Sequence, residues 1–167
     1  MKIGIVSDSH GQAELLAKAI DLLTDSGAEV LVHCGDIGSP ACAMLLGWAD
    51  VPAYAVLGNV DLSAAELDAA AESSGLKLKW DFITVPLADA GKLAVTHGDQ
   101  EDLLAELISG GQYAYVCHGH THCRRDEQVG GVRVINPGSL HCSRDKGPGA
   151  ALLDTQAGRL EYIDLSS

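Results

Sequence analysis

The sequence predicts an α/β (α+β) fold in which two packed mixed β-sheets form a β-sandwich flanked by α-helices. Three observations predict it. In the first half of the 167-residue chain, short apolar stretches alternate with helical patterns, an order that gives parallel strands joined by crossover helices. In the second half, short strand patterns follow one another with little helix between them. No linker-like stretch separates the halves, so we expect one domain over residues 1–167.

The elements of the first half follow from apolar spacing. Residues 2–7 are apolar and β-branched, as in a short buried strand. Residues 12–24 carry Leu, Ile and Ala at helical spacing on one face, which predicts a helix. Proline suits a first helical turn, and a Ser with a Glu three residues later has the spacing of a capping box. The further elements expected here are strands over 29–33 and 51–57, a short helix after Pro40, and a helix from Ser63 through about residue 73.

The second half is richer in strand patterns. One helix is expected over residues 100–108, with Asp99 as its N-cap. The pairs Gly130-Gly131 and Ala157-Gly158 predict the turns of two hairpins. The strands expected in this half cover residues 78–86, 92–97, 113–117, 121–128, 132–136, 149–154 and 159–164.

The composition excludes several classes of function. Acidic residues outnumber basic ones by 23 to 11, for a net charge of −12. Because proteins that bind long nucleic acids use basic patches, we expect no such partner. There is no signal-peptide pattern and no apolar run of the ~18 residues that a membrane helix needs, so we expect no membrane partner. Five cysteines without CxxC spacing are typical of reduced thiols, which predicts a cytoplasmic protein.

Polar clusters follow several of the predicted strands and hold the candidate functional residues. A glycine within or beside each cluster allows a tight turn and a close approach of the backbone. Ligand sites of open α/β sheets lie beyond the carboxyl ends of strands, so we expect the clusters to meet at one edge. The clusters are Asp8-Ser9-His10, Gly35-Asp36, Gly58-Asn59-Val60-Asp61, Thr96-His97-Gly98 and Gly119-His120-Thr121-His122.

The residue types in these clusters indicate a site for two metal ions. Imidazole and carboxylate ligands together suit Zn, Mn, Fe and Ni, whereas an all-oxygen set suits Mg or Ca. Two cations ~3.5–4 Å apart need a bridging carboxylate, for which Asp36 on its glycine turn is the candidate. In an extended segment, Asp8 and His10 would share a face, as would His120 and His122, because side chains alternate along a strand. Each cluster alone is commonly an ordinary turn, and their combination is what favours a metal centre.

Six motifs occur in order between residues 7 and 139: SDSHG, CGDIG, LGNVD, THGD, GHTH and INPGS. Together they resemble the calcineurin-like metallophosphoesterase superfamily, and the short chain with its GNVD form resembles the compact bacterial and archaeal phosphodiesterase branch. The resemblance implies a metallophosphoesterase-like sandwich of two mixed sheets. It also implies a phosphodiesterase that hydrolyses small phosphate diesters by in-line attack of a metal-bridging hydroxide at a binuclear site.

The resemblance assigns ligands and cofactors residue by residue. It implies two divalent cations, with Mn as the first choice and Ni, Fe, Zn or Mg as alternatives. Asp36, Asn59 and His97 are the residues expected to serve catalysis. Relatives in this branch form homo-oligomers, so a dimer or tetramer is an expected assembly. One ion would bind Asp8, His10, Asp36 and His122, and the other Asp36, Asn59, His97 and His120.

The chain departs from the family pattern at Val60. Many superfamily members carry a histidine directly after the metal-binding asparagine, commonly assigned to contact phosphate and protonate the leaving group. Valine can do neither, and general acid–base help is typically worth about 10²–10⁴-fold. We therefore expect better activity on esters with good leaving groups. Asn59 and His141, which follows the INPGS turn, are the expected substrate contacts.

Several further residues have a structural interpretation that we favour over a functional one, as packed side chains, turn residues or solvated charges. Asp61 and Asp99 stay open between accepting hydrogen bonds from ligand histidines and closing turns or caps. The residues with a favoured structural interpretation are His33, His118, Asn136, Arg144, Lys146, Cys34, Cys117 and Cys123.

Two alternatives to a phosphodiesterase stay open. One is a phosphomonoesterase or phosphoprotein phosphatase of the same superfamily, against which the missing histidine argues. The other is a non-catalytic scaffold like the retromer subunit that shares this fold and has an altered metal site. Against the scaffold, all the ligand positions of this chain hold the expected residue types. The substrate itself depends on pocket shape and loops, which the sequence does not reveal.

Overall fold

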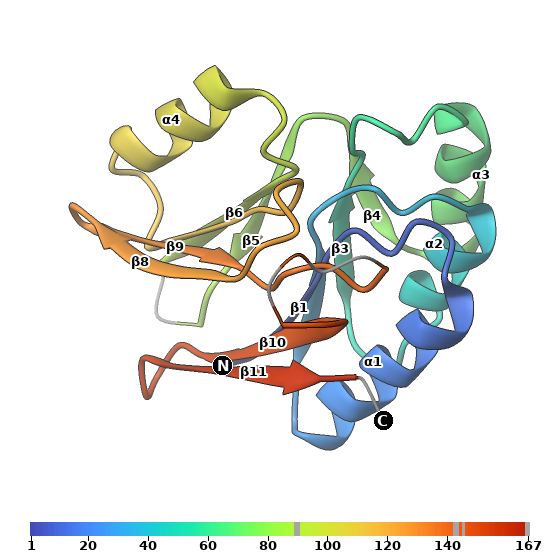
Figure 1. Cartoon of the computed structure of the whole chain (residues 1–167), viewed down its shortest axis with the longest axis horizontal. Helices are drawn as coiled ribbons and strands as arrows, with labels where there is room; N and C mark the ends of the chain where they lie inside the picture. The colour runs from blue at the N-terminus through green and yellow to red at the C-terminus, as the bar shows by residue number, and fades with distance from the viewer. Residues whose placement is uncertain (89–90, 142–143, 145, 166–167) are drawn as a thin grey trace.

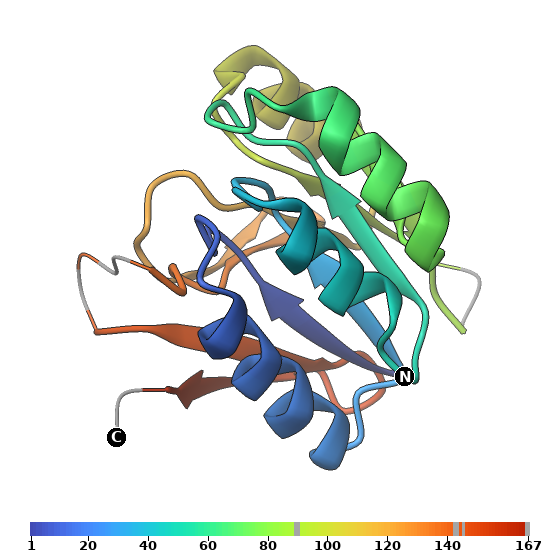
Figure 2. The same cartoon turned by 90° about the vertical axis from the view of Figure 1, so that its right-hand side faces the viewer.

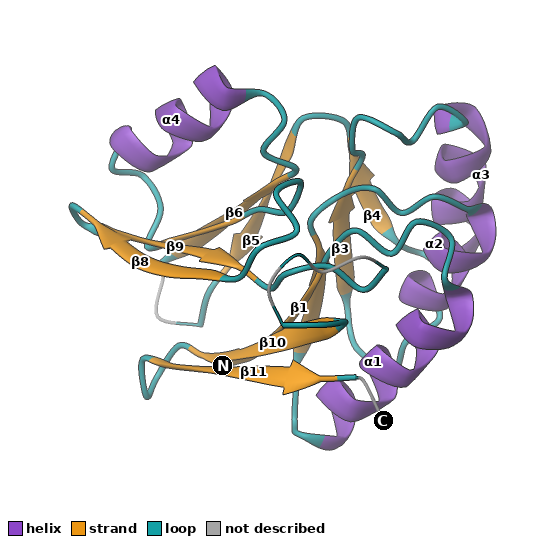
Figure 3. Ribbon diagram, viewed as in Figure 1, coloured by secondary structure: helices purple, strands orange, loops and turns teal. Residues whose placement is uncertain are grey.

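The computed structural model describes residues 1–88, 91–141, 144 and 146–165. Two mixed sheets pack face to face with helices outside them, which confirms the predicted fold class (Figures 1 and 3). The strand order is β11-β10-β1-β2-β3-β4 in the first sheet and β5-β6-β7-β9-β8 in the second. None of the helices in the described ranges has the length and apolar character that a membrane span requires.

The first sheet is built from parallel strands joined by helices, as the alternating pattern predicts. Figure 2 shows the three helices side by side on one face of this sheet. β10 (Gly149–Asp154) and β11 (Arg159–Asp164) extend the sheet as an antiparallel hairpin beside β1. The parallel part consists of β1 (Lys2–Val6), α1 (Ala13–Asp25), β2 (Val30–His33), α2 (Pro40–Gly47), β3 (Ala53–Val56), α3 (Ala64–Ser74) and β4 (Lys77–Lys79).

The second sheet comes from the second half of the chain and carries one helix, α4, on its outer face (Figure 1). Two of its strand pairs are parallel and two are antiparallel, so the sheet is mixed. Val129 pairs with Val132, which confirms a hairpin turn at Gly130-Gly131. Its elements are β5 (Phe82–Pro86), β6 (Lys92–Thr96), α4 (Glu101–Ser109), β7 (Tyr115–Cys117), β8 (Arg125–Val129) and β9 (Val132–Asn136).

Apolar side chains fill three layers. The inner layer lies between the sheets, where Ile3 and Val32 belong to the same cluster as Val95 and Ile135. A second layer packs α1, α2 and α3 on the first sheet, and a third packs Leu107 of α4 on the second. Burial of these side chains is the main favourable term in folding. This burial fixes the positions of the strands, and therefore the positions of the polar clusters that follow them.

The structure corrects several predicted boundaries. The strand expected over 78–86 is two strands, because the chain crosses from the first sheet to the second at Trp80 and Asp81. Residues 121–124 precede β8 rather than forming its start. The N-cap of α4 is Gln100, not Asp99, which is exposed. Ser63 is the N-cap of α3 but makes no side-chain cap hydrogen bond, so the expected capping box does not form.

Candidate metal centre

The loops that follow β1, β2, β3, β6 and β7 converge between the two sheets (Figure 1). Backbone hydrogen bonds join them: the Asp8 amide donates to the Gly35 carbonyl at 3.0 Å, and the Gly119 amide donates to the His97 carbonyl at 2.9 Å. The polar clusters of these loops therefore meet at one edge, as their position after strands indicates.

A first set of side chains forms a tight cluster of possible ligands. One ligand atom from each of Asp8, His10, Asp36 and His122 lies within 4.8 Å of the others. His122 Nε2 is 3.1 Å from Asp8 Oδ1, and His10 Nε2 is 3.7 Å from Asp36 Oδ2. The two carboxylates are buried and the two imidazoles are partly exposed. This set is the one that the resemblance assigns to the first ion.

A second set is joined pairwise through Asn59. Its Oδ1 is 3.0 Å from His97 Nε2 and 3.0 Å from His120 Nδ1. On the far side of the His97 ring, Nδ1 is 2.8 Å from the Cys34 carbonyl, which can only accept. Nδ1 therefore carries a proton, and Nε2 is directed to the site. The Cys34 carbonyl is a functional group that the sequence gives no signal for, because it belongs to the backbone.

Asp36 lies between the two sets. Its Oδ2 is 3.7 Å from His10 Nε2 and 3.4 Å from His97 Nε2, while its Oδ1 accepts a hydrogen bond from the Val60 amide at 3.1 Å. Burial acts to raise the pKa of Asp36, but hydrogen bonds and charge from His97, with the Val60 amide, lower it below its ordinary value. Burial also acts to lower the pKa of His97, yet Asp36 raises it overall. Positive charge beside Asp36 is thus favoured.

The donor set fits a divalent cation. Asp8 is fully buried, and its pKa is raised, chiefly by burial, although Ser7 donates a hydrogen bond to Oδ2 at 2.5 Å. Among the described residues the other oxygen, Oδ1, makes no hydrogen bond, although His122 Nε2 lies 3.1 Å from it. A buried carboxylate oxygen without a partner is costly, and a cation held between Asp8 and His122 would satisfy it. Carboxylate and imidazole are the ligands that Mn, Fe, Ni and Zn accept.

The backbone at this site is unusual. Left-handed φ values are rare for residues other than glycine, and they persist where the surroundings hold them. The expectation that the Asp-x-His and His-x-His pairs share a face of an extended segment is therefore wrong, since β1 ends at Val6 and these residues lie in left-handed turns. In the described residues, the non-glycine residues with positive φ are Asp8 (53°), His10 (45°), Asp36 (56°), His120 (64°) and His122 (59°).

Two glycines let the backbone approach the carboxylates closely. A Cβ atom at Gly58 would overlap Asp36 Oδ1, and one at Gly119 would overlap Ser7 Oγ and lie 2.6 Å from Asp8 Oδ2. Any larger residue at either position would displace a carboxylate. At these two positions, glycine is required because there is no room for a side chain.

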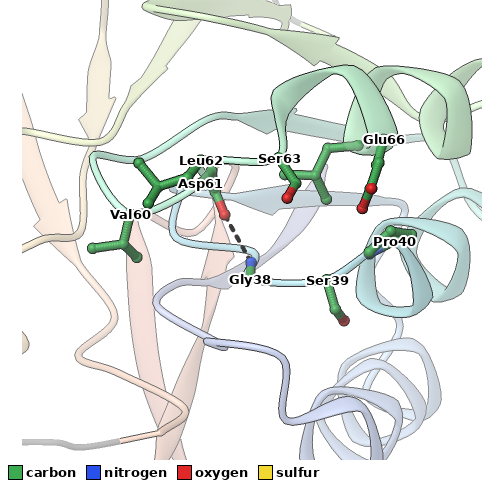
Figure 4. Close-up of a pocket in the computed structure, with 9 residues that line it drawn as sticks. Gly38, Ser39, Pro40, Val60, Asp61, Leu62, Ser63 and Glu66 are labelled. Atoms are coloured by element: carbon green, nitrogen blue, oxygen red, sulfur yellow. Dashed lines mark hydrogen bonds between the residues drawn. The ribbon is translucent and has the colours of Figure 1, made fainter.

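Asp61 ties the loop after β2 to the loop after β3. Its buried carboxylate accepts hydrogen bonds from the backbone amides of Ile37 at 3.1 Å, Gly38 at 2.7 Å and Gly58 at 2.8 Å. Figure 4 shows the bond to Gly38. The sequence left Asp61 open between a histidine partner and a turn residue, and these bonds show a loop-closing role. They hold Asp36 and Asn59, which flank the bonded amides, at a fixed separation.

His33 and His118 are packed side chains. His33 Nδ1 accepts a hydrogen bond from the Gly35 amide at 3.2 Å, its Nε2 is 2.9 Å from Ser9 Oγ, and burial lowers its pKa to about 3. Burial also lowers the pKa of His118 to about 4. His141 differs, because its side chain is exposed and its ring centroid is 5.5 Å from that of His10. The structure therefore brings one histidine beyond the expected ligands to the rim of the first set.

The other residues with a favoured structural interpretation are either buried in the protein or exposed at its surface. Asn136 is buried and donates to the Gly119 carbonyl at 2.8 Å, which anchors the loop that carries His120. Cys34 and Cys117 are buried free thiols whose pKa burial raises. Cys42 and Cys123 are also free, Arg144 and Lys146 are exposed, and Cys142 lies outside the described residues.

Comparisons with known proteins agree with this geometry. The family model of the calcineurin-like phosphoesterase superfamily domain matches residues 1–158. Phosphodiesterase MJ0936 of Methanocaldococcus jannaschii is 35% identical over 167 residues, covering 99% of this chain and 98% of the relative. A solved structure described as a novel archaeal phosphodiesterase matches with a TM-score of 0.88 and 33% identity, covering 98% of this chain and 99% of that one.

Vps29 of Chaetomium thermophilum matches with a TM-score of 0.70 at 15% identity, covering 98% of this chain and 93% of that one, and shares the fold alone. The family model spans nearly the whole chain, and the archaeal relative is similar over the full length of both proteins. The expected superfamily is therefore confirmed. This chain belongs to the calcineurin-like phosphoesterase superfamily.

Proposed function

We propose that this protein is a metal-dependent phosphodiesterase with a binuclear centre that hydrolyses small phosphate diesters. The observation that carries the proposal is the position of Asp36, whose Oδ2 lies 3.7 Å from His10 Nε2 and 3.4 Å from His97 Nε2. One carboxylate thus contacts an imidazole from each set, as a bridging ligand would. The similarity to phosphodiesterase MJ0936 supports the choice of diesters as substrates.

Two divalent cations would be held by the two sets, with Asp36 shared. When bound, such cations activate a water nucleophile and neutralise charge on the phosphate oxygens. Mn is our first choice, and Ni, Fe, Zn and Mg are alternatives. The proposed ligands are Asp8, His10, Asp36 and His122 for one ion, and Asp36, Asn59, His97 and His120 for the other.

Backbone groups of the chain orient the proposed ligands. The Cys34 carbonyl fixes the ring of His97 so that Nε2 faces the site, and the Val60 amide holds Asp36 Oδ1. The Val60 side chain has no proton to give, so leaving groups that depart as stable anions are favoured. His141, exposed beside His10, is the side chain that we propose for substrate contact, together with Asn59.

The experiment uses metal-stripped protein. Mn²⁺, Ni²⁺, Zn²⁺ or Mg²⁺ is added, and hydrolysis of bis-p-nitrophenyl phosphate is compared with that of p-nitrophenyl phosphate. Asp36→Ala and His97→Ala are the test variants, and Trp48→Phe, at the C-cap of α2, is the matched control. Metal-dependent cleavage of the diester, lost in both test variants and kept in the control, is the expected result.

Two other results would redirect the proposal. Faster cleavage of the monoester would make the protein a phosphomonoesterase or phosphoprotein phosphatase. No hydrolysis by folded, metal-loaded protein would favour a scaffold. Cytoplasmic localisation and a dimeric or tetrameric assembly are part of the proposal, and fractionation and light scattering test them.

A further inference from the structure

Three exposed apolar side chains lie on segments that neighbour the second ligand set. Among the described residues, Val60 is 44% exposed, Leu62 is 92% exposed and Trp80 is 62% exposed. Val60 and Leu62 lie on the loop after β3, which also carries Asn59, and Trp80 lies where the chain crosses from β4 to β5. We call these three side chains the apolar shelf. Phe82, also exposed, is left out because it lines a separate groove against α4.

Strand register places the apolar shelf next to the metal centre. β3 and β4 are parallel and Val56 pairs with Lys79, so Trp80 stands beside Leu57, two positions before Asn59. The Leu57 amide donates to the Lys79 carbonyl at 3.0 Å. Neighbouring strands are about 4.8 Å apart. Trp80 is therefore adjacent to the segment that leads directly into a proposed ligand.

The other side of the crossover is tied to the strand that leads into His97. Thr96 Oγ1 donates to the Asp81 carbonyl at 2.9 Å, and His97 is the next residue along the chain. In Figure 1 the crossover forms an arch beside the loop after β3. The Trp80-Asp81 dipeptide thus lies between the segments that supply Asn59 and His97.

The loop that carries Val60 and Leu62 is held rigidly. Asp61, between them, binds three backbone amides. Val60 and Leu62 line, together with Pro40 and Glu66, the pocket that Figure 4 shows. A cavity of about 150 Å³ lies between this loop and the first turns of α2 and α3. Val60 and Leu62 are therefore exposed on a loop that the hydrogen bonds of Asp61 hold in place.

We propose that the apolar shelf binds a planar aromatic ester group of the diester substrate, with its face against Trp80 and its edge against Val60 and Leu62. The inference rests on the proposed phosphodiesterase function. Val60 directly follows Asn59, and Trp80 lies beside the segment that leads into Asn59, so a phosphate at the second ligand set would lie next to both segments. Stacking on an aromatic side chain needs no basic residue, which suits a chain with a net charge of −12.

The shelf also compensates for the residue type at position 60. A valine there forms no hydrogen bond to the substrate, so binding energy has to come from parts of the substrate away from phosphorus. Aromatic stacking supplies about 5- to 100-fold in affinity per ring. An ester group that stays on phosphorus during hydrolysis can stack in this way if it carries a nucleobase or an aryl ring, whereas a retained methyl group cannot.

The test varies the ester group while the leaving group stays constant. Methyl, phenyl and thymidine 5′-esters of p-nitrophenyl phosphate are compared by kcat/KM for the metal-loaded wild type, Trp80→Ala and Trp48→Ala. Trp48 is the matched control because it is also 62% exposed but lies at the C-cap of α2, away from the site. The thymidine and phenyl arms distinguish a preference for nucleobases from one for simple aryl groups.

We expect the preference for phenyl or thymidine over methyl to fall by about 5- to 100-fold in Trp80→Ala. The methyl ester is the reference substrate within each protein, and Trp48→Ala should keep both the wild-type rate and the aromatic preference. Wild-type selectivity in Trp80→Ala would overturn the shelf while leaving the phosphodiesterase intact. Cleavage of no diester by the wild type would instead reject the proposed function.

A binding measurement separates the two ideas further. The chain has two tryptophans, so Trp48→Phe leaves Trp80 as the only one. Thymidine 5′-monophosphate should quench Trp80 fluorescence, whereas inorganic phosphate should not. Absence of quenching at saturating nucleotide would overturn the shelf even if diesters are cleaved. Sedimentation of Trp80→Ala completes the test: a dimer that becomes a monomer would make the shelf a contact between copies and overturn substrate binding there.

Discussion

The two ligand sets at the candidate metal centre are held in different ways. In the first set, four ligand atoms lie within 4.8 Å of one another, and all four residues have positive φ. In the second set, Asn59 and His120 are exposed, and His97 is oriented by a hydrogen bond of 2.8 Å to the Cys34 carbonyl. Every residue of the first set thus lies in a left-handed turn, whereas in the second set only Asp36 and His120 do, and hydrogen bonds orient His97 and Asn59.

This difference indicates that the two sets have different functions. Strained turns persist only where packing holds them, which suits ligands that never leave the buried interior, such as Asp8. Exposed ligands such as Asn59 and His120 are open to an incoming phosphate. We infer that the first set anchors a metal ion, whereas the second faces the substrate. The experiments below test this contrast.

The largest effect is expected at Asp36, which belongs to both sets. Asn tolerates positive φ, so Asp36→Asn keeps the shape and removes the charge. Loss of a bridging carboxylate removes several kcal/mol of transition-state stabilisation, or roughly 10³-fold in diester hydrolysis. Metal analysis should show fewer than two ions per chain. A variant with two tightly bound ions and wild-type activity would remove Asp36 from the bridge.

A smaller effect is expected at Asp61, which connects the sets without belonging to either. Asp61→Ala leaves the amides of Ile37, Gly38 and Gly58 without their acceptor. A buried donor without a partner costs about 1–3 kcal/mol, so the free energy of unfolding should fall by about 3 kcal/mol in urea titrations of metal-free protein.

Asp99→Ala is the matched control for this measurement. Asp99 is exposed and lies on the loop after β6, two residues after His97. Surface substitutions usually change stability by less than about 0.5 kcal/mol. Equal stability of the two variants would show that Asp61 does not hold the loops together.

The sequence predicted the components of this site better than their conformation. The sequence allows one to predict the polar residues beside glycine that follow the buried strands. It also allows one to predict the order of strands and helices that brings these residues to one edge. The left-handed turns at His10 and His122 are not visible, because they depend on neighbouring loops that form hydrogen bonds only in the folded chain. Alternation along a strand therefore gave the wrong reason for grouping these pairs.

The boundaries that failed have a similar cause. The stretch over 78–86 has a continuous strand pattern, yet it is divided at Trp80 because its two ends pair with different sheets, Tyr54–Val56 on one side and Lys92–Thr96 on the other. Pairing partners are tertiary, so local propensity cannot locate the crossover. The Cys34 carbonyl was missed for the same reason, since any residue can supply a backbone oxygen.

Stepwise metal binding would sharpen the contrast between the sets. The compact first set should bind metal more tightly than the exposed second set. Titration calorimetry of metal-free protein with Mn²⁺ should therefore show two binding events of different affinity. Each substitution removes one ligand from one set, so His122→Ala should weaken the tighter binding event and His120→Ala the weaker one. Each loss should exceed the about 10- to 100-fold that removal of a residue supporting a ligand costs. Loss of the tighter event in His120→Ala would reverse the assignment of the anchoring set.

The last expected effect concerns His33, whose side chain contacts the turns of the first set from outside it. Its Nδ1 accepts from the Gly35 amide and its Nε2 contacts Ser9 Oγ, so the ring is held neutral between the turns of Asp8 and Asp36. Burial lowers its pKa from 6.5 to about 3. Below about pH 6.5 the unfolded chain therefore takes up a proton that the folded chain does not.

This uptake makes stability rise with pH across the window from about 3 to 6.5, with a slope of up to about 1.4 kcal/mol per pH unit from His33. The contribution is fully present above that window and is lost as the pH falls through it. His33→Gln cannot titrate, so its unfolding free energy, measured in metal-free protein between pH 4 and pH 7, should depend less on pH than that of the wild type. Equal slopes in the two proteins would mean that folding does not lower the pKa of His33, so that the folded protein protonates it as readily as the unfolded chain. The Gly35 and Ser9 contacts could then not both be present, and the first set would lose the support that distinguishes it from the second.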